Sequence, residues 1–276
     1  MAERIEHDEW QAVAKGWRHW EPVLQSFTWP MSLRMASAAQ IGPGDRVLDA
    51  GCGIGDPTLQ VAVLVGPHGR VLGIDMAEGM IATARERAAA LGLTHAEFQT
   101  ADVTTMDLPA ESFDIVLGRW SLIYMHDVAA TLGRLRRALV PGGRIAISAW
   151  APPETNPWLT IPMAEVARVH PPPPPEAEGP GVFHLSADGA LARALIAAGF
   201  QTVGQERVVL SWFVRDPGEF WAIQSDLTGP LAPLLARFTA AEREQVARGV
   251  ASGIAAFRTG DAYRVPAQAQ LAWGRA

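Results

Sequence analysis

The sequence predicts a doubly wound α/β fold, and two observations support that prediction. Short apolar runs, rich in β-branched residues, recur between residues 46 and 150, and helical segments separate most of them. The first run leads directly into a glycine-rich turn. Strands that alternate with helices are typical of a parallel sheet with helices on both faces. The predicted strands are Arg46–Ala50, Arg70–Asp75, Ala96–Thr100, Phe113–Gly118 and Arg144–Trp150.

The helical segments between these strands carry recognisable end signals. Asp56 is the expected N-cap of the first, with Pro57 as its first helical residue. Gly92 follows the second as a C′ glycine, and the third begins after Asp127 and stops at Pro141. Right-handed crossovers through such helices make the sheet doubly wound. The predicted helices are Pro57–Val65, Ala77–Leu91 and Val128–Val140.

Helical segments are also expected before this region. Residues 8–40 place several large apolar side chains on one helical face, and two prolines divide the region into two short helices. The face consists of Trp10, Val13, Trp17 and Trp20, and the prolines are Pro22 and Pro30.

The pattern becomes less regular after Trp150. The run Pro171–Pro175 predicts a rigid spacer, although it also fits a recognition motif for a partner domain. Beyond it, two strands and two helical regions are expected. They are a helix over Ala187–Ala198, a strand over Gln201–Val214, a mostly helical region over Pro217–Phe257 with an interruption near Gly229, and a last strand over Tyr263–Trp273.

Composition excludes several classes of protein. The chain has 276 residues and a net charge of −6, which argues against nucleic acid or an anionic membrane as the main partner. Its one cysteine, Cys52, cannot form an intrachain disulfide, and no Cys/His cluster has the spacing of a metal site. The start of the chain is too polar for a signal peptide, and no apolar run reaches the ~18 residues of a membrane span. A cytoplasmic protein without a metal is expected.

The glycine-rich turn contains the strongest functional signal. The decapeptide VLDAGCGIGD, residues 47–56, joins an apolar strand to a helix through Gly51, Gly53 and Gly55, as at the ligand-binding corner of an open α/β sheet. A dinucleotide site would need a third glycine where Asp56 stands, and a carboxylate there repels a pyrophosphate. With Asp49, this turn has two acids, which suit a cationic ligand. S-adenosylmethionine carries a sulfonium and an ammonium group and no phosphate.

Two further acids stand at strand ends. Asp75 ends the second strand, where a carboxylate can accept hydrogen bonds from both ribose hydroxyls. Asp102 follows the third strand and is placed to accept from an adenine amino group, with Val103 or Phe98 covering the ring. A loop-capping role for Asp102 is the alternative.

Successive motifs of the chain resemble the class I S-adenosylmethionine-dependent methyltransferases. The resemblance is strongest to the ubiquinone and menaquinone biosynthesis methyltransferases and related bacterial small-molecule methyltransferases. It covers roughly residues 40–150 and implies a seven-stranded sheet with six parallel strands and one antiparallel strand. The motifs are VLDAGCGIGD, the acid in VLGIDM, the ADV after the third strand, FDIVLGRW and LRRALVPGGRIAIS.

The resemblance also implies roles for individual residues. Asp49 and the three glycines Gly51, Gly53 and Gly55 would line the methionine half of the cofactor, and Asp75 would hold the ribose. The remaining cofactor-binding positions are Met76 and Val103 on the adenine, Asp102 at its amino group, and Arg119 and Trp120 facing the methionine and the substrate. No metal ion is implied.

The chain departs from the family pattern after the fourth strand. Relatives often have a histidine pair there, whereas this sequence has Ile123 and Tyr124, with His126 further on. Tyr124 and His126 are therefore the candidates for orientation or proton transfer, and a structural role for both is the alternative.

Ten tryptophans against two tyrosines either fill the core or form an aromatic pocket. At least two of Trp17, Trp20, Trp29, Trp120 and Trp158 are predicted to line a substrate pocket. The expected function is methyl transfer to a small, largely apolar or aromatic acceptor. A nicotinamide-dependent oxidoreductase and a non-catalytic S-adenosylmethionine-binding module are the alternatives. The acceptor atom (O, N or C) and the oligomeric state stay open.

The chain is accordingly expected to have four parts. These are an N-terminal helical cap (1–40), a cofactor-binding Rossmann-like core (41–150), a substrate-side insertion (151–185) and the rest of the core (186–276), with a helical lid at 217–257.

Overall fold

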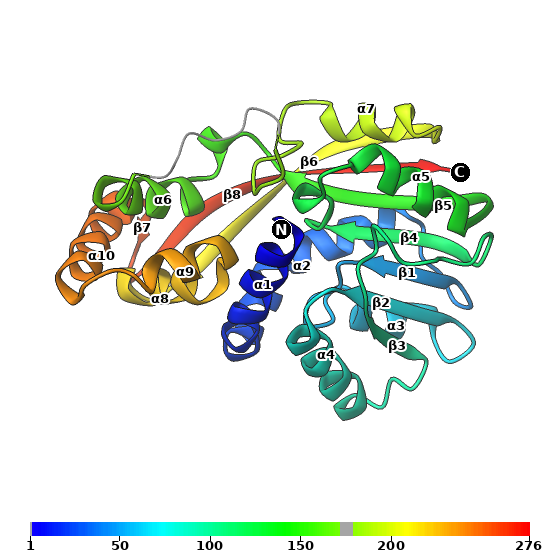
Figure 1. Ribbon diagram of the computed structural model, residues 1–276, viewed down its shortest axis with the longest axis horizontal. Helices are drawn as coiled ribbons and strands as arrows, with labels where there is room; N and C mark the ends of the chain where they lie inside the picture. Colours follow the sequence, from blue (N-terminus) through cyan, green and yellow to red (C-terminus); the bar gives the residue numbers. More distant parts are fainter. Residues whose placement is uncertain (1, 172–178) are drawn as a thin grey trace.

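A computed structural model describes residues 2–171 and 179–276 of the chain (Figure 1). Its sheet has the strand order β3-β2-β1-β4-β5-β8-β6, and the short β7 pairs with β8. The strands are β1 (Arg46–Ala50), β2 (Arg70–Asp75), β3 (Ala96–Thr100), β4 (Phe113–Arg119), β5 (Leu139–Trp150), β6 (Gln201–Val214), β7 (Arg258–Thr259) and β8 (Ala262–Arg275). All five strands predicted before residue 151 are present.

The sheet is mostly parallel. β1 pairs in parallel with β2 and β4, and β3 and β5 continue the parallel pairing on either side. Only β8 runs against its neighbours, since it is antiparallel to both β5 and β6. The predicted doubly wound sheet with six parallel strands and one antiparallel strand is confirmed. β7 was not predicted, and it adds a two-residue hairpin arm to β8.

Helices cover both faces of the sheet (Figure 1). They are α1 (Ala2–His19), α2 (Glu21–Ala38), α3 (Thr58–Val65), α4 (Glu78–Ala90), α5 (Val128–Ala138), α6 (Pro157–Val169), α7 (Ala190–Ala197), α8 (Pro217–Leu227), α9 (Ala232–Leu235) and α10 (Ala240–Ile254). In the described residues, no helix is long and apolar enough to cross a membrane. The predicted spacer Pro171–Pro175 lies, from residue 172 onward, outside the described residues.

Three helix predictions need correction at their ends or interior. α3 begins at Thr58, and Pro57 rather than Asp56 takes the N-cap position, because the Asp56 carboxylate bonds elsewhere. α5 ends at Ala138, because the chain enters β5 before it reaches the proline at 141. Pro30 does not break α2. Burial of the apolar face of α2, which includes Phe27 and Met31, offsets the hydrogen bond that the proline removes.

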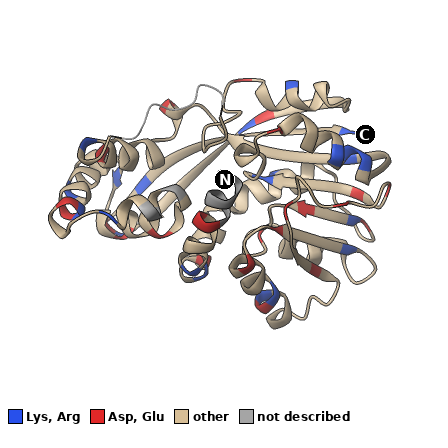
Figure 2. Ribbon diagram, viewed as in Figure 1, with Lys and Arg blue, Asp and Glu red and all other residues tan. Residues whose placement is uncertain are grey.

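β6 and β8, with 14 residues each, are the longest strands and leave the core as a two-stranded ribbon (Figure 1). The helices α6, α8 and α10 pack together at the far end of this ribbon. α1 packs against both α4 of the core and α8 of this group, so it joins the two parts. Charged side chains lie mainly on the outer helices and at strand ends (Figure 2), while β1 and β4 form the buried centre.

Candidate active site

A cavity of about 420 Å³ opens at the carboxyl ends of the parallel strands. In an open α/β sheet this edge is where ligands bind. Because the strand order places β3, β2 and β1 on one side and β5, β8 and β6 on the other, the cavity has two ends. Gly51, Gly53, Asp75, Met76, Asp102 and Val103 line the first end, and Phe27, Trp120, Trp150, Trp158, Trp212 and Gln224 are among the residues that line the second.

The glycine turn after β1 is held by backbone hydrogen bonds. The amides of Gly51 and Cys52 both donate to the carbonyl of Ile74 in β2, at 2.8 and 2.9 Å. Gly51 has φ +80°, and a Cβ on it would lie 2.4 Å from the Cβ of Ser121. Only glycine fits there. Gly55 also has a positive φ, of +98°, but it packs against α3 and α4 and does not line the cavity.

Asp75 and Asp102 order the two loops beside this turn. The Asp75 carboxylate accepts hydrogen bonds from the amides of Gly53 and Ala77, at 2.9 and 3.0 Å. Asp102 Oδ1 accepts from both the amide and the hydroxyl of Thr104. This loop-capping role does not displace Asp102 from the cavity, which it still lines. The strand-end acids therefore stand where the sequence predicts, and each fixes the loop that carries it.

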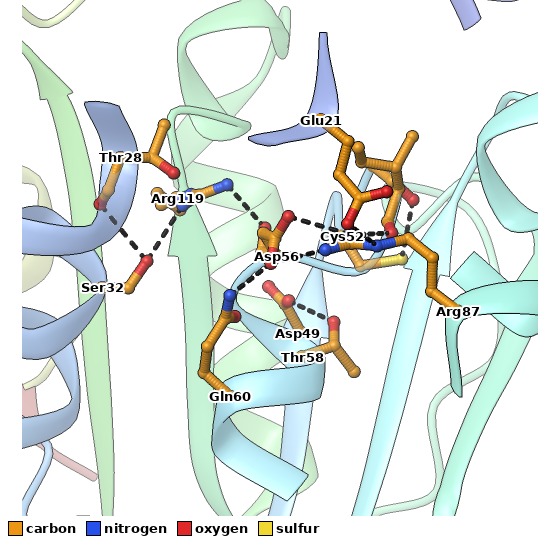
Figure 3. A network of polar contacts seen from close by, with 12 residues as sticks. Glu21, Thr28, Ser32, Asp49, Cys52, Asp56, Thr58, Gln60, Arg87 and Arg119 are labelled. Carbon is orange, nitrogen blue, oxygen red and sulfur yellow. Dashed lines mark hydrogen bonds and ion pairs between the residues drawn. The ribbon is translucent and has the colours of Figure 1, made fainter. Parts of the chain in front are cut away.

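Asp56 is not the free carboxylate that the charge argument assumed. Its Oδ2 lies 2.9 Å from Arg87 Nη1, and Arg87 Nε in turn contacts Glu21 at 2.9 Å (Figure 3). The Asp56 side chain is 4% exposed, so the ion pair is buried, and Arg87 is shared between Asp56 and Glu21. The ion pair lowers the charge that Asp56 presents, and its selection of a cationic ligand stays a prediction.

Asp49 lies behind the turn rather than in the cavity wall. It is fully buried and accepts a hydrogen bond of 2.6 Å from Thr58 Oγ1 (Figure 3). Burial raises the pKa of Asp49 to about 6, although the Thr58 hydrogen bond and the charge of Arg119 oppose the shift. This carboxyl is therefore a support of the turn whose charge depends on pH.

Arg119 lines the cavity, but its guanidinium is held by the protein. Nη1 donates to Ser32 Oγ at 2.9 Å, and Nη2 donates to the Asp56 carbonyl at 2.7 Å (Figure 3). These bonds tie β4 to α2 and to the glycine turn. Arg119 thus fixes the position of the glycine turn relative to β4 and α2.

The loop after β4 joins the two ends of the cavity. Trp120 adopts φ +54°, which is unusual for a residue other than glycine, and its amide donates to Ser148 Oγ at 3.1 Å. Its ring stacks on Trp150 at 4.4 Å between centroids. Tyr124 meets Trp10 edge-on at 5.0 Å, while His126 is exposed at the rim of the cavity. Burial, together with the charge of Glu9, raises the pKa of the Tyr124 phenol well above its ordinary value.

Three of the five predicted pocket tryptophans, Trp17, Trp120 and Trp158, line the cavity. Trp17 lies beside Gly53 rather than at the aromatic end, and its Nε1 donates to the Leu227 carbonyl. Trp20 and Trp29 do not line it. Trp20 donates to Asp226, and Trp29 is 43% exposed on the solvent side of α2.

Four important residues of the aromatic end were missed. Phe27 stacks on Trp212 at 3.8 Å, and Trp150 lies 4.7 Å from Trp158. Gln224 of α8 lies in the wall of the same end. The sequence offered a signal for two of them, since Trp150 ends a parallel strand and Trp212 shares the inward face of β6 with Leu210 and Val214. No comparable signal marks Phe27 or Gln224.

Comparisons with known proteins identify the family. Residues 41–167 match the family described as Methyltransferase domain. Over 151 residues the chain is 38% identical to the aklanonic acid methyltransferase DauC of Streptomyces sp. (strain C5), covering 51% of this chain and 68% of DauC. It is 35% identical over 186 residues to the nocamycin O-methyltransferase of Saccharothrix syringae, covering 63% of this chain and 65% of that enzyme. Roughly a third of each relative is therefore unmatched.

The solved structure of the [4+2]-cyclase SpnF has the same fold, with a TM-score of 0.57, 20% identity, and coverage of 96% of this chain and 95% of that chain. Its name gives a different reaction, so fold alone does not fix the chemistry. The family match and the sequence relatives identify the reaction class. The chain belongs to the S-adenosylmethionine-dependent methyltransferases. Nothing supports a nicotinamide-dependent oxidoreductase. Among the described residues, no group of three or more His, Cys, Asp or Glu is placed to hold a metal.

Proposed function

We propose that this chain transfers a methyl group from S-adenosylmethionine to a compact, largely aromatic small molecule. One observation carries the proposal. A single cavity has the glycine turn and strand-end acids at one end and a cluster of large aromatic rings at the other. A donor and an acceptor bound at these two ends meet at the loop after β4.

The first end fits S-adenosylmethionine. Gly51 and Gly53 offer backbone that a ligand can approach closely, and Asp75 stands at the end of β2 for the ribose. Met76 and Val103 supply apolar surfaces for the adenine, with Asp102 at its amino group. When bound, S-adenosylmethionine supplies a methyl group already activated by a sulfonium, so we propose that no metal ion is needed. Asp49, Gly55 and Arg119 hold the turn in shape rather than the ligand.

The protein's main task is then to align the acceptor. Holding two reactants in line can lower the activation free energy by several kcal/mol, on the order of 7 in favourable cases. Trp120, fixed by its Ser148 bond and its stack on Trp150, forms the wall between the two ends. We assign Tyr124 the role of a hydrogen-bond donor at this junction, because its phenol stays protonated. His126 at the rim is the proposed proton acceptor for acceptors that must lose a proton.

The relatives support a small-molecule acceptor, since their names give aklanonic acid and nocamycin as the molecules concerned. The aromatic end favours a flat, apolar molecule over a polyanion. The lack of a nucleic-acid partner remains a prediction from the acidic composition. Cytoplasmic location remains a prediction from the single cysteine and the lack of a signal-peptide or membrane-span pattern.

Calorimetry and a transfer assay test the proposal. The chain should bind S-adenosylhomocysteine and not NADH, and should move labelled methyl from S-adenosylmethionine to a member of a panel of hydroxylated naphthalenes and anthraquinones. Asp75→Ala should weaken S-adenosylhomocysteine binding by at least roughly tenfold, because it loses a charge-assisted partner of the ligand and of the Gly53 amide. The matched control is Asp188→Ala, which removes a surface ion pair with Arg207.

The outcomes separate the alternatives. Firm binding of S-adenosylhomocysteine with no transfer to any panel member would favour a non-catalytic binding module. Binding of NADH in place of S-adenosylhomocysteine would overturn the proposal altogether.

A further inference from the structure

Three side chains that line the cavity bury a hydrogen-bond donor that has no partner among the residues the structure describes. They are Trp120 with Nε1, Trp212 with Nε1 and Gln224 with Nε2. Trp212 is 2% exposed and Gln224 is 1% exposed. A buried donor without a partner costs roughly 1–3 kcal/mol, and such groups are rare in folded proteins. Their gathering in one cavity therefore indicates a partner that binds there.

Other tryptophans of the same cavity show that the protein can satisfy such donors. Trp158 Nε1 donates to Asn156 Oδ1 at 2.9 Å, and Trp17 Nε1 donates to the Leu227 carbonyl at 2.9 Å. Trp158 and Trp212 belong to one ring cluster, 6.0 Å apart between centroids. The indole donor of Trp158 is thus used within the protein, whereas that of Trp212 has no partner among the described residues.

The surroundings of these donors define the ligand's chemistry. The Trp212 ring stacks on Phe27 at 3.8 Å, with an interplanar angle of 17°. Gln224 comes from the middle of α8, which packs against β6. An indole N–H donates a hydrogen bond and cannot accept one, and the same holds for the nitrogen of a side-chain amide. A ligand that satisfies them must present hydrogen-bond acceptors, such as carbonyl oxygens, from an otherwise apolar body.

We infer that Trp212 and Gln224 are specificity residues that bind oxygen atoms of the methyl acceptor, and that the acceptor is an oxygenated aromatic compound such as a quinone or aryl ketone. The inference rests on the proposed function, since it concerns the acceptor end of the same cavity. Trp120, at the junction, also buries its Nε1 without a partner among the described residues. A purely hydrocarbon acceptor would leave all three donors without partners.

A matched pair of probes isolates this effect. Anthraquinone-2-sulfonate and anthracene-2-sulfonate are soluble, flat and alike except for the two carbonyl oxygens. Calorimetry with the full chain saturated with S-adenosylhomocysteine should show that the quinone binds at least roughly tenfold more tightly, as expected for one or two satisfied buried donors.

Two variants and a control assign that preference to residues. Trp212→Phe keeps an aromatic ring against Phe27 and removes the N–H, and Gln224→Leu removes the amide at similar volume. Each should lower the preference for the quinone by roughly fivefold or more. Trp158→Phe is the matched control. It also shrinks a ring of the cluster, but its donor already has a protein partner, so both probes should weaken equally.

The results distinguish this inference from the proposed function. If S-adenosylhomocysteine does not bind, the proposed function fails. If it binds but the wild type shows no preference for the quinone, because the probes bind equally or neither binds, the inference is overturned. It is also overturned if both variants keep the full preference, because groups other than Trp212 and Gln224 would then recognise the quinone oxygens. Thermal melting shows whether each variant is folded, and either folded variant suffices for the test.

Discussion

The two ends of the cavity differ in how completely their polar groups are paired. At the cofactor end, Asp75 and Asp102 accept hydrogen bonds from the loops around them, and Asp56 forms an ion pair with Arg87. At the acceptor end, Trp212 and Gln224 bury donors without partners among the described residues. The polar groups named at the first end are therefore paired within the protein, whereas the donors at the second end need a ligand to pair with.

This difference follows from what each end has to bind. The cofactor is the same in every turnover, so a turn held rigidly by its own hydrogen bonds is ready to receive it. The acceptor must be told apart from similar molecules. Unpaired buried donors reject an acceptor that lacks the matching oxygens, and this discriminates more strongly than a change in apolar volume. The protein thus gives up some stability at the acceptor end in return for selectivity.

The largest expected effect comes from breaking the cofactor end at Gly51. In Gly51→Ala the new Cβ would lie 2.4 Å from Ser121 Cβ, at a φ of +80° that alanine adopts only with strain. The turn or the loop after β4 must move. We expect binding of S-adenosylhomocysteine to fall by at least about 100-fold, or about 2.7 kcal/mol. Calorimetry measures this directly.

Gly133→Ala is the matched control for that variant. Gly133 lies in α5, and a Cβ there has no neighbour within 4 Å. Alanine in a helix interior stabilises by about 1 kcal/mol relative to glycine, so this variant should melt no lower and bind S-adenosylhomocysteine as the wild type does. Unchanged binding in Gly51→Ala would show that the turn tolerates displacement.

The next effect concerns the buried acid behind the turn. Burial raises the pKa of Asp49 to about 6 in the folded chain, from an ordinary value of 3.8. A raised pKa favours folding at low pH, and this contribution is lost as the pH rises through 6. Between pH 5 and pH 7.5, Asp49 should therefore cost the wild type roughly 1.5 kcal/mol of unfolding free energy. Asp49→Asn should lack this loss.

Urea unfolding at several pH values measures the difference between variant and wild type. Asp114→Asn is the control, because the Arg46 side chain holds the pKa of Asp114 below its ordinary value. That group stays ionised throughout the range, so its variant should differ from the wild type by a constant amount. A constant difference for Asp49→Asn as well would mean that its carboxyl does not titrate in this range.

The same contrast explains what could be predicted from the sequence. The cofactor end is built from residues at the ends of successive strands with clear patterns, so Gly51, Asp75 and Asp102 could be placed at one edge. The charge of Asp56 could not be judged, because its partner Arg87 is 31 residues away on α4.

The acceptor end is assembled from α2, β5, α6, β6 and α8, which are far apart in the sequence. The alternation along β6 shows that Trp212 faces inward, but not that Phe27 of α2 stacks on it. Trp29 shows the opposite failure, since a helix rich in apolar residues on every side gave no reason to place it on the solvent side. Pairing across segments depends on tertiary packing, which periodicity does not encode.

The smallest expected effect concerns the junction between the two ends. Tyr124→Phe keeps the edge contact with Trp10 and removes only the hydroxyl. If that hydroxyl orients the acceptor in the transition state, kcat should fall by roughly three- to fivefold, on the order of 1 kcal/mol, with binding of S-adenosylhomocysteine unchanged. A rise in KM alone would assign Tyr124 to ground-state binding, and no change in either constant would leave it a structural residue.

The chain has two tyrosines, so one variant, Tyr263→Phe, serves both as the control for Tyr124→Phe and as the protein for a pH titration. Tyr263 lies in β8 and does not line the cavity, so Tyr263→Phe should leave transfer unchanged. In that variant, ultraviolet absorbance reports the ionisation of Tyr124 alone. Burial should keep the phenol protonated well above pH 10, which is its ordinary pKa. Ionisation near pH 10 would contradict a buried hydroxyl and, with it, the role of Tyr124 as a permanent donor at the point where the two ends meet.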